Sequence, residues 1–215
     1  MASTQTYQSQ SSEQFLSLAQ LVLSPQSTVA LFISAKTEEG APVIVLTKRA
    51  QSDSWADALL QPSTHGKLKP EELSQAENCL FSAYNNALIR EVGKELGDNI
   101  QELIKISSSK IQLINAICEQ DENNQTILRI TYFLNTNFRS TDFKNLAVLE
   151  QGVSLYFIKP EEAQKVQPLE KDHKQQGVPD GEFRMFQDQI MPLKTAFSLM
   201  EEKKFLGIYR PWIAS

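Results

Sequence analysis

The chain has 215 residues, a length that suits one sizeable domain with a hydrophobic core of its own. Its formal net charge of −5 argues against a general nucleic-acid-binding protein, since such proteins need a basic surface to neutralise phosphates. No apolar run approaches the roughly 20 residues that span a bilayer, and the N-terminus does not resemble a secretory signal. We therefore expect a cytoplasmic protein that binds neither nucleic acid nor membrane.

The first predicted elements are a polar tail, a short helix and a pair of strands. Residues 1–12 are rich in Ser and Gln, which predicts a disordered tail. Apolar residues recur at helical spacing over 13–23, so we expect a short amphipathic helix there. Two β-rich runs at 27–36 and 42–50 flank the segment TEEGA (37–41), which predicts a hairpin.

A long helix is the clearest prediction in the middle of the chain. Apolar residues recur at steps of three and four from Leu73 to Leu96. Pro70 suits the first turn of this helix, where a proline costs no hydrogen bond. Gly97 suits a left-handed helix stop. The pattern therefore predicts one helix over residues 73–96, packed on one face of a sheet.

The second half of the chain predicts two more strands and a closing helix. The runs 126–138 and 153–160 are β-rich, 161–166 suits a short helix, and a longer helix is expected over 188–204. No repeat or linker divides the sequence. We therefore expect a single mixed α/β domain over residues 13–215, with helical additions at both ends.

Two glutamates on the long helix are the first candidates for chemistry. Glu91 and Glu95 are four residues apart, so their side chains leave the same helix face on consecutive turns. Carboxylates held in this way attract a hard divalent cation such as Mg²⁺. The plainer alternative is a solvated helix face with ordinary charges, and the spacing alone does not decide between the two.

The surroundings of this pair resemble the signature of the Nudix hydrolases, G-x5-E-x7-R-E-U-x-E-E-x-G-U, where U is a bulky aliphatic residue. The positions that reproduce the signature are Gly66, Glu72, Arg90, Glu91, Val92, Glu95 and Gly97. The chain departs from it by ten extra residues within 73–89, which we interpret as a lengthened helix or an added turn. Lys94 stands where an acid belongs, and Asp98 where an aliphatic residue belongs. The resemblance covers about residues 28–160.

The resemblance implies a fold, an activity and a set of site residues. The implied fold is an α/β/α sandwich around a mixed β-sheet, and the implied activity is hydrolysis of a diphosphate linkage in a nucleoside diphosphate derivative. The catalytic candidates are Glu91, Glu95 and Arg90, with Arg90 orienting the carboxylates. The implied ligands of Mg²⁺ or Mn²⁺ are Glu91, Glu95, the carbonyl of Gly66, and Glu150 in a later loop. The candidate substrate-binding residues are Lys94, Lys48, Arg49 and His65.

Lys94 leaves the choice between an enzyme and a binding module open. A lysine beside two metal-binding acids removes an oxygen ligand and adds repulsion. It can extend into solvent and leave a reduced but working site, or bind a substrate phosphate directly. It can also pair permanently with Glu91, which would make the domain a nucleotide-binding or regulatory module without turnover. An isomerase on the same scaffold would need a His/Cys metal cluster, which the sequence does not offer.

The remaining expectations concern partners and isolated residues. A small-molecule diphosphate substrate is the expected partner, and the resemblance adds a homodimer as an option. Cys79 and Cys118 lack metal-like spacing and are expected to be buried small residues. Gly93 inside a helix indicates close approach of another backbone or of a ligand. Trp55 and Phe138 suit a core role better than base stacking.

Overall fold

The computed structural model describes residues 23–49, 59–76, 79–107, 110–149, 153–169 and 183–201. The predicted tail, almost all of the predicted N-terminal helix, Trp55 and Glu150 therefore lie outside the described residues. In the part of the chain that is described, no helix is both long and apolar enough to cross a membrane.

A mixed β-sheet forms the centre of the molecule. Its strands are β1 (Thr28–Lys36), β2 (Pro42–Arg49), β3 (Leu60–Gln61), β4 (Thr64–Lys67), β5 (Ile111–Gln120), β6 (Thr126–Leu134) and β7 (Val153–Ile158). The order along the sheet is β3-β2-β1-β6-β5, with β4 paired to β1 and β7 paired to β2. The β1–β6 pair is parallel and the other pairs are antiparallel, so the sheet is mixed as expected.

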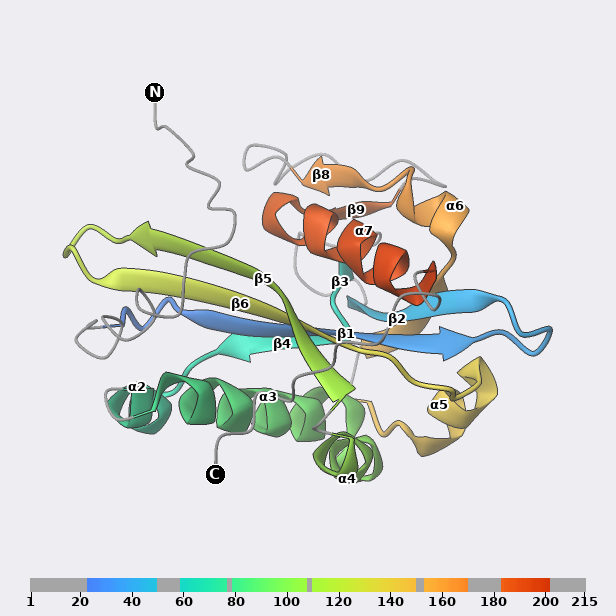
Figure 1. Ribbon diagram of the computed structural model, residues 1–215, viewed down its shortest axis with the longest axis horizontal. Helices are drawn as coiled ribbons and strands as arrows, with labels where there is room; N and C mark the ends of the chain where they lie inside the picture. Colours follow the sequence, from blue (N-terminus) through green and yellow to red (C-terminus); the bar gives the residue numbers. More distant parts are fainter. Residues whose placement is uncertain are drawn as a thin grey trace.

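Helices cover both faces of this sheet, as Figure 1 shows. The lower layer in that view contains α2 (Pro70–Ala76), α3 (Leu80–Leu96) and α4 (Asp98–Ile106), with α5 (Ser140–Leu146) to one side. The upper layer contains α6 (Pro160–Ala163), α7 (Gln187–Glu201) and the small parallel pair β8 (Gln167–Leu169) and β9 (Arg184–Phe186). The predicted α/β/α sandwich is confirmed.

Strand β1 shows how the sequence places the two layers. It is buried at every position between its first and last residues, as expected for a central strand. Val29, Leu31 and Ile33 alternate to the side of α3, whereas Phe32 belongs to the core under α7. The predicted hairpin follows, because the Thr37 N–H donates to the Ala41 carbonyl at 2.8 Å and β2 pairs back on β1.

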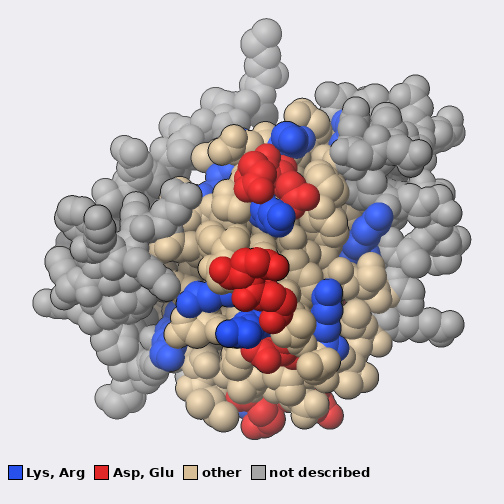
Figure 2. Space-filling model, turned by 90° about the vertical axis from the view of Figure 1, so that its right-hand side faces the viewer, with Lys and Arg blue, Asp and Glu red and all other residues tan. Residues whose placement is uncertain are grey.

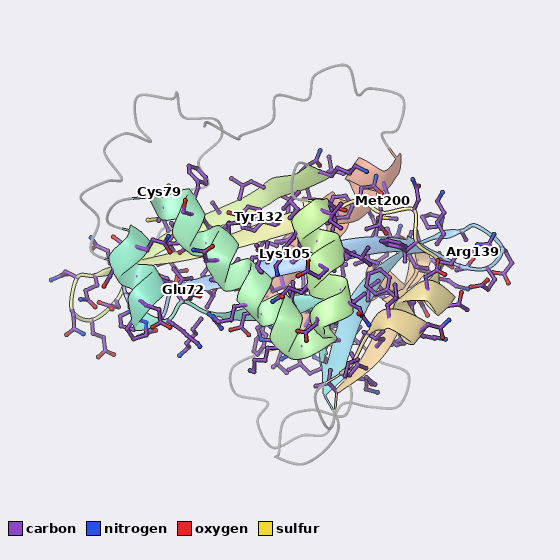
Figure 3. The ribbon with its side chains drawn as sticks, turned by 90° about the horizontal axis from the view of Figure 1, so that it is seen from below. Glu72, Cys79, Lys105, Tyr132, Arg139 and Met200 are labelled. Atoms are coloured by element: carbon purple, nitrogen blue, oxygen red, sulfur yellow. The ribbon has the colours of Figure 1, made fainter. Side chains whose placement is uncertain are left out.

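The prediction of one helix over residues 73–96 is wrong, because the structure has two helices there. Helix α2 ends at Ala76, and Cys79 is extended, with φ −153° and ψ 96°, just before α3 begins. The ten extra residues of the motif therefore neither lengthen one helix nor add a single turn. They include a break between two helices, which lets α2 fold back beside α3 (Figure 3).

The end of α3 leads directly into α4, which the sequence did not predict. Gly97 has φ +89°, a conformation that glycine adopts without strain, and its N–H donates to the Gly93 carbonyl. Asp98 occupies the first turn of α4, which explains why an acid replaces the aliphatic residue of the motif. A Cβ at Gly93 would lie 3.0 Å from Gln101 Cδ and closer to its amide nitrogen, so the close neighbour is a side chain of α4.

Three other predictions have clear outcomes. Cys79 and Cys118 are both exposed, so the expectation of buried cysteines is wrong. Cys118 lies on β5, at the end of the strand order, where β6 is its one neighbouring strand among the residues that the structure describes. Phe138 packs against the core on the α3 side and meets Phe143 edge-on, with ring centroids 6.1 Å apart, as a core residue should.

Candidate active site

An ionic network joins α2 to α3 at the motif. The Arg90 guanidinium donates to Glu72 from Nε at 2.8 Å and from a terminal nitrogen at 2.9 Å, a bidentate contact. The same side chain donates to Glu91 and to the carbonyl of Lys67. Figure 3 labels Glu72 on α2 and Cys79 at the start of α3, the two ends of the fold-back. Arg90 therefore ties α2, α3 and β4 together.

The helix break makes this network possible. Glu72 and Arg90 are eighteen residues apart, and a continuous helix would separate them by about 27 Å at about 1.5 Å per residue. Because α2 lies beside α3, the two side chains meet within hydrogen-bonding distance. Glu72 therefore lies beside the motif residues of α3, although the predicted single helix was wrong.

Glu91 packs where Gly66 has no side chain. A Cβ built at Gly66 would lie 2.5 Å from Glu91 Cγ and nearer still to Cδ. Gly66 pairs with Val29 of β1, so β4 presents bare backbone to α3 at this point. Glu91 is only 5% exposed as a result. The motif glycine and this acid are thus in contact, as the resemblance implies.

Glu95 contacts the same strand one turn further along α3. Its Oε2 accepts a hydrogen bond from the His65 N–H at 3.1 Å, and its Oε1 lies 3.9 Å from His65 Nδ1. Glu95 is also 5% exposed. Both acids of the predicted pair therefore face β4, and each has a hydrogen-bond donor that holds it before any ligand arrives.

Burial and charge distinguish this region from an ordinary helix surface. Glu72, Glu91 and Glu95 are all at least 94% buried; Arg90 pairs with Glu72 and Glu91, and Glu95 accepts a hydrogen bond from the His65 N–H. Buried charges are costly unless paired or bound to metal. The solvated-face alternative for Glu91 and Glu95 is therefore wrong.

Hydrogen bonds also favour the ionised form of Glu72, at the α2 end of the network. Burial disfavours the Glu72 carboxylate, but the hydrogen bonds from Arg90 and from the Lys69 N–H hold its pKa below the usual value. The bond to Glu72 likewise raises the pKa of Arg90. The Glu72–Arg90 pair therefore stays charged through the neutral range.

Lys94 has a different environment from the two acids beside it. It is exposed, and it lines a cleft of about 460 Å³ at the junction of α3, α4 and residues 148–149. Glu91 pairs with Arg90, and within the described residues no ion pair joins Lys94 to Glu91. Of the three arrangements weighed for Lys94, permanent pairing with Glu91 is not observed.

The other predicted substrate-binding residues are less closely placed. Lys48 shares its strand face with Ile44 and Leu46, which lie in the core under α7, so it points to the opposite face of the sheet from Glu91. The side chain of Arg49 and all of Glu150 lie outside the described residues, so those two predictions stay predictions. His65 is beside Glu95, as described above.

A divalent cation fits the donor set that Glu91 and Glu95 provide. Mg²⁺ is typically bound by one or two carboxylates, with water and substrate phosphates completing its shell. Among the described residues there is no group of three or more His, Cys, Asp and Glu side chains that could hold a metal.

Several contributors to this region carry no readable signal in the sequence. The carbonyl of Lys67 and the N–H of Lys69 act through the backbone, where residue type is silent. Val148 approaches Gly97 from a loop about fifty residues away.

Figure 2 shows acidic and basic side chains interleaved over the end of the molecule with the β1–β2 hairpin, where Arg139 lies 3.6 Å from Glu38.

Comparison with known proteins finds matches among solved structures. No family model and no curated protein matches the sequence. An Ap4A hydrolase from C. elegans is 13% identical over 82% of this chain and 98% of its own, with a TM-score of 0.43. A Nudix-family hydrolase from Clostridium perfringens is 16% identical over 83% and 99%, with a TM-score of 0.43. The Nudix domain of Shewanella oneidensis NrtR, solved with ADP ribose, is 10% identical over 89% and 99%, with a TM-score of 0.42.

These solved structures are described as Nudix proteins or as an Ap4A hydrolase, and the sequence motif resembles the Nudix signature. With identities of 10% to 16% and TM-scores below 0.5, this likeness assigns no chemistry to the chain.

Proposed function

We propose that this domain hydrolyses a diphosphate linkage in a nucleoside diphosphate derivative, with Mg²⁺ or Mn²⁺ bound at Glu91 and Glu95. The observation that carries the proposal is the pair of carboxylates on α3, Glu91 and Glu95, which are both 5% exposed and both packed against β4. A fold that needed only a structural link between α3 and β4 would gain nothing from burying two carboxylates there. A site that takes up a cation and a phosphorylated ligand would use them.

Arg90 and the His65 N–H would hold the two acids of α3 in position for the proposed reaction. Arg90 is clamped to Glu72 and fixes the orientation of Glu91, so this acid needs no rearrangement when a ligand binds. The His65 N–H fixes Glu95, which is the candidate to take up a proton from the attacking water. The cation, when bound, neutralises charge on the phosphates and makes the attacking water more acidic.

A second candidate function is a nucleotide-binding module without turnover. The observation that favours it is that Arg90 already pairs with Glu91, while residue 94 is a lysine where the signature has an acid. Such a site has two acids for metal rather than three. The two candidates differ in turnover, so the deciding measurement is kinetic.

The test is phosphate release from a panel of nucleoside di- and triphosphates, dinucleoside polyphosphates and nucleotide sugars, with Mg²⁺ or Mn²⁺ at neutral and alkaline pH. We expect Glu95→Gln to lose at least ~100-fold in rate, because an amide neither anchors a cation nor accepts a proton. The matched control is Glu102→Gln, since Glu102 is exposed on α4 and pairs with Lys105.

The Lys94→Glu variant tests whether residue 94 affects the metal site or binds the substrate phosphate. Higher activity would mean that lysine merely weakens the metal site, whereas lower activity with a higher KM would mean that Lys94 holds substrate phosphate. Absence of turnover on every substrate, in wild type and in Lys94→Glu, would replace the hydrolase by the binding module. Equal rates for Glu95→Gln and wild type would refute the assigned role of Glu95.

A further inference from the structure

The cleft beside Lys94 is separate from the contacts that hold the buried acids. Its volume is about 460 Å³, within the range of small-ligand sites. Neither Glu91 nor Glu95 lines it. The residues that do are Gly93, Lys94, Gly97, Asp98, Asn99, Val148 and Leu149.

One wall of the cleft is held in place by three contacts. The Val148 N–H donates to the Leu96 carbonyl at 3.0 Å, which fixes the loop to the end of α3. The Asn99 amide lies 3.5 Å from the Leu146 carbonyl, a long hydrogen bond between α4 and the same loop. Gly97 leaves just enough room, because a Cβ there would lie 2.9 Å from Val148 Cβ. The wall is therefore formed before a ligand arrives, which lowers the entropy cost of binding.

The lining combines three chemistries within one small space. Lys94 is an exposed cation, Asp98 is an exposed anion, and within the described residues neither belongs to an ion pair. Val148 is 67% exposed and adds an apolar surface beside them. A simple anion would be attracted by Lys94 but repelled by Asp98. A ligand with a phosphate, several hydroxyl groups and an apolar part matches all three.

We propose that this cleft binds the sugar-phosphate part of a nucleotide, with the phosphate on Lys94 and the sugar hydroxyls on Asp98, and that this binding needs no divalent cation. The lysine supplies a fixed positive charge where the motif resemblance would place an acid and its metal. The inference rests on the proposed function for the class of ligand, but the binding itself does not depend on turnover.

The test is calorimetric titration of the full chain with ribose 5-phosphate, ADP and inorganic phosphate in buffer that contains EDTA. Lys94→Met should weaken ribose 5-phosphate and ADP by about tenfold or more, since a charge-assisted hydrogen bond is lost. Asp98→Asn should weaken ribose 5-phosphate several-fold yet leave inorganic phosphate unchanged or tighter, because a repelling charge has been removed. Lys105→Met is the matched control, as Lys105 lies two turns further along α4 and pairs with Glu102.

Three results would overturn the inference: unchanged ribose 5-phosphate affinity in Lys94→Met, an Asp98→Asn effect equal for ribose 5-phosphate and inorganic phosphate, or binding that appears only after Mg²⁺ is added. Loss of hydrolysis alone leaves metal-free binding intact, and loss of Lys94-dependent binding leaves a Glu95-dependent hydrolysis intact. The two proposals therefore fail separately.

Discussion

Gly66→Ala tests whether Glu91 occupies the space that the motif glycine leaves. Gly66 is not among the residues with positive φ, so alanine suits the strand backbone without strain. The added methyl group would nevertheless fall 2.5 Å from Glu91 Cγ and nearer to the carboxyl carbon. Glu91 would have to move, although it is 95% buried and held by Arg90.

The expected cost follows from that displacement. Forcing an extra methyl group into a packed site typically costs about 1–3 kcal/mol. In a chain of this size each kcal/mol lowers Tm by about 2–4 °C. We therefore expect Gly66→Ala to reduce the free energy of unfolding by about 1–3 kcal/mol, measured by urea denaturation and confirmed by thermal melting.

A double-mutant cycle attributes this cost to Glu91. In a Glu91→Ala background the carboxylate is gone, so Gly66→Ala should cost less than about 0.5 kcal/mol. Gly40→Ala is the matched control: Gly40 has φ +85° and no neighbour within 4 Å of the added carbon, so strain should cost the same in both backgrounds. An equal cost of Gly66→Ala with and without the Glu91 carboxylate would refute the contact.

Two further predictions concern the contacts of α3 with α2 and with α4. The pKa of Glu72 is lowered in the folded protein, so its contribution to stability is complete above the ordinary carboxyl pKa of about 4.3 and is lost as the pH falls towards the folded value. Glu72→Gln should therefore flatten the acid limb of a stability–pH curve, and an unchanged limb would contradict the Arg90 pairing. Gly93→Ala should stabilise a Gln101→Ala background by up to about 1 kcal/mol through helix propensity, but should gain less in the wild type, because the Gln101 amide must leave the Ile89 carbonyl. An equal gain in both backgrounds, by chemical denaturation, would contradict that contact.

The break between α2 and α3 shows why the fold was only partly predictable. Apolar spacing records which residues face the core, and it continues from Leu73 and Ala76 into Leu80 and Ala83 across the break. Two helices that bury the same side produce the same pattern as one. The strands were easier, because alternation along β1 depends on the local chain alone.

Exposure of the cysteines and formation of the cleft depended on information that one sequence does not carry. Cys118 is exposed because β5 lies at the end of the strand order, and the order of strands is a tertiary property. The cleft joins α4 to Val148, and the short apolar pattern of Ile100 and Ile104 did not reveal α4 in advance. By contrast, Glu91 and Glu95 could be found from spacing and motif, because four residues always separate consecutive turns of one helix face.

Arg90 accounts for the presence of a lysine three residues after a buried acid. A lysine at that distance on a helix is within reach of Glu91, and an unpaired buried carboxylate would attract it. Glu91 pairs with the guanidinium of Arg90 instead, because the bidentate contact with Glu72 fixes the position of that guanidinium. Lys94 is then left exposed at the cleft, and Glu95 keeps the His65 N–H as its donor. The network therefore creates two environments on one turn of α3, a buried pair of acids and an exposed cation, and the two proposals assign a metal to the first and a phosphate to the second.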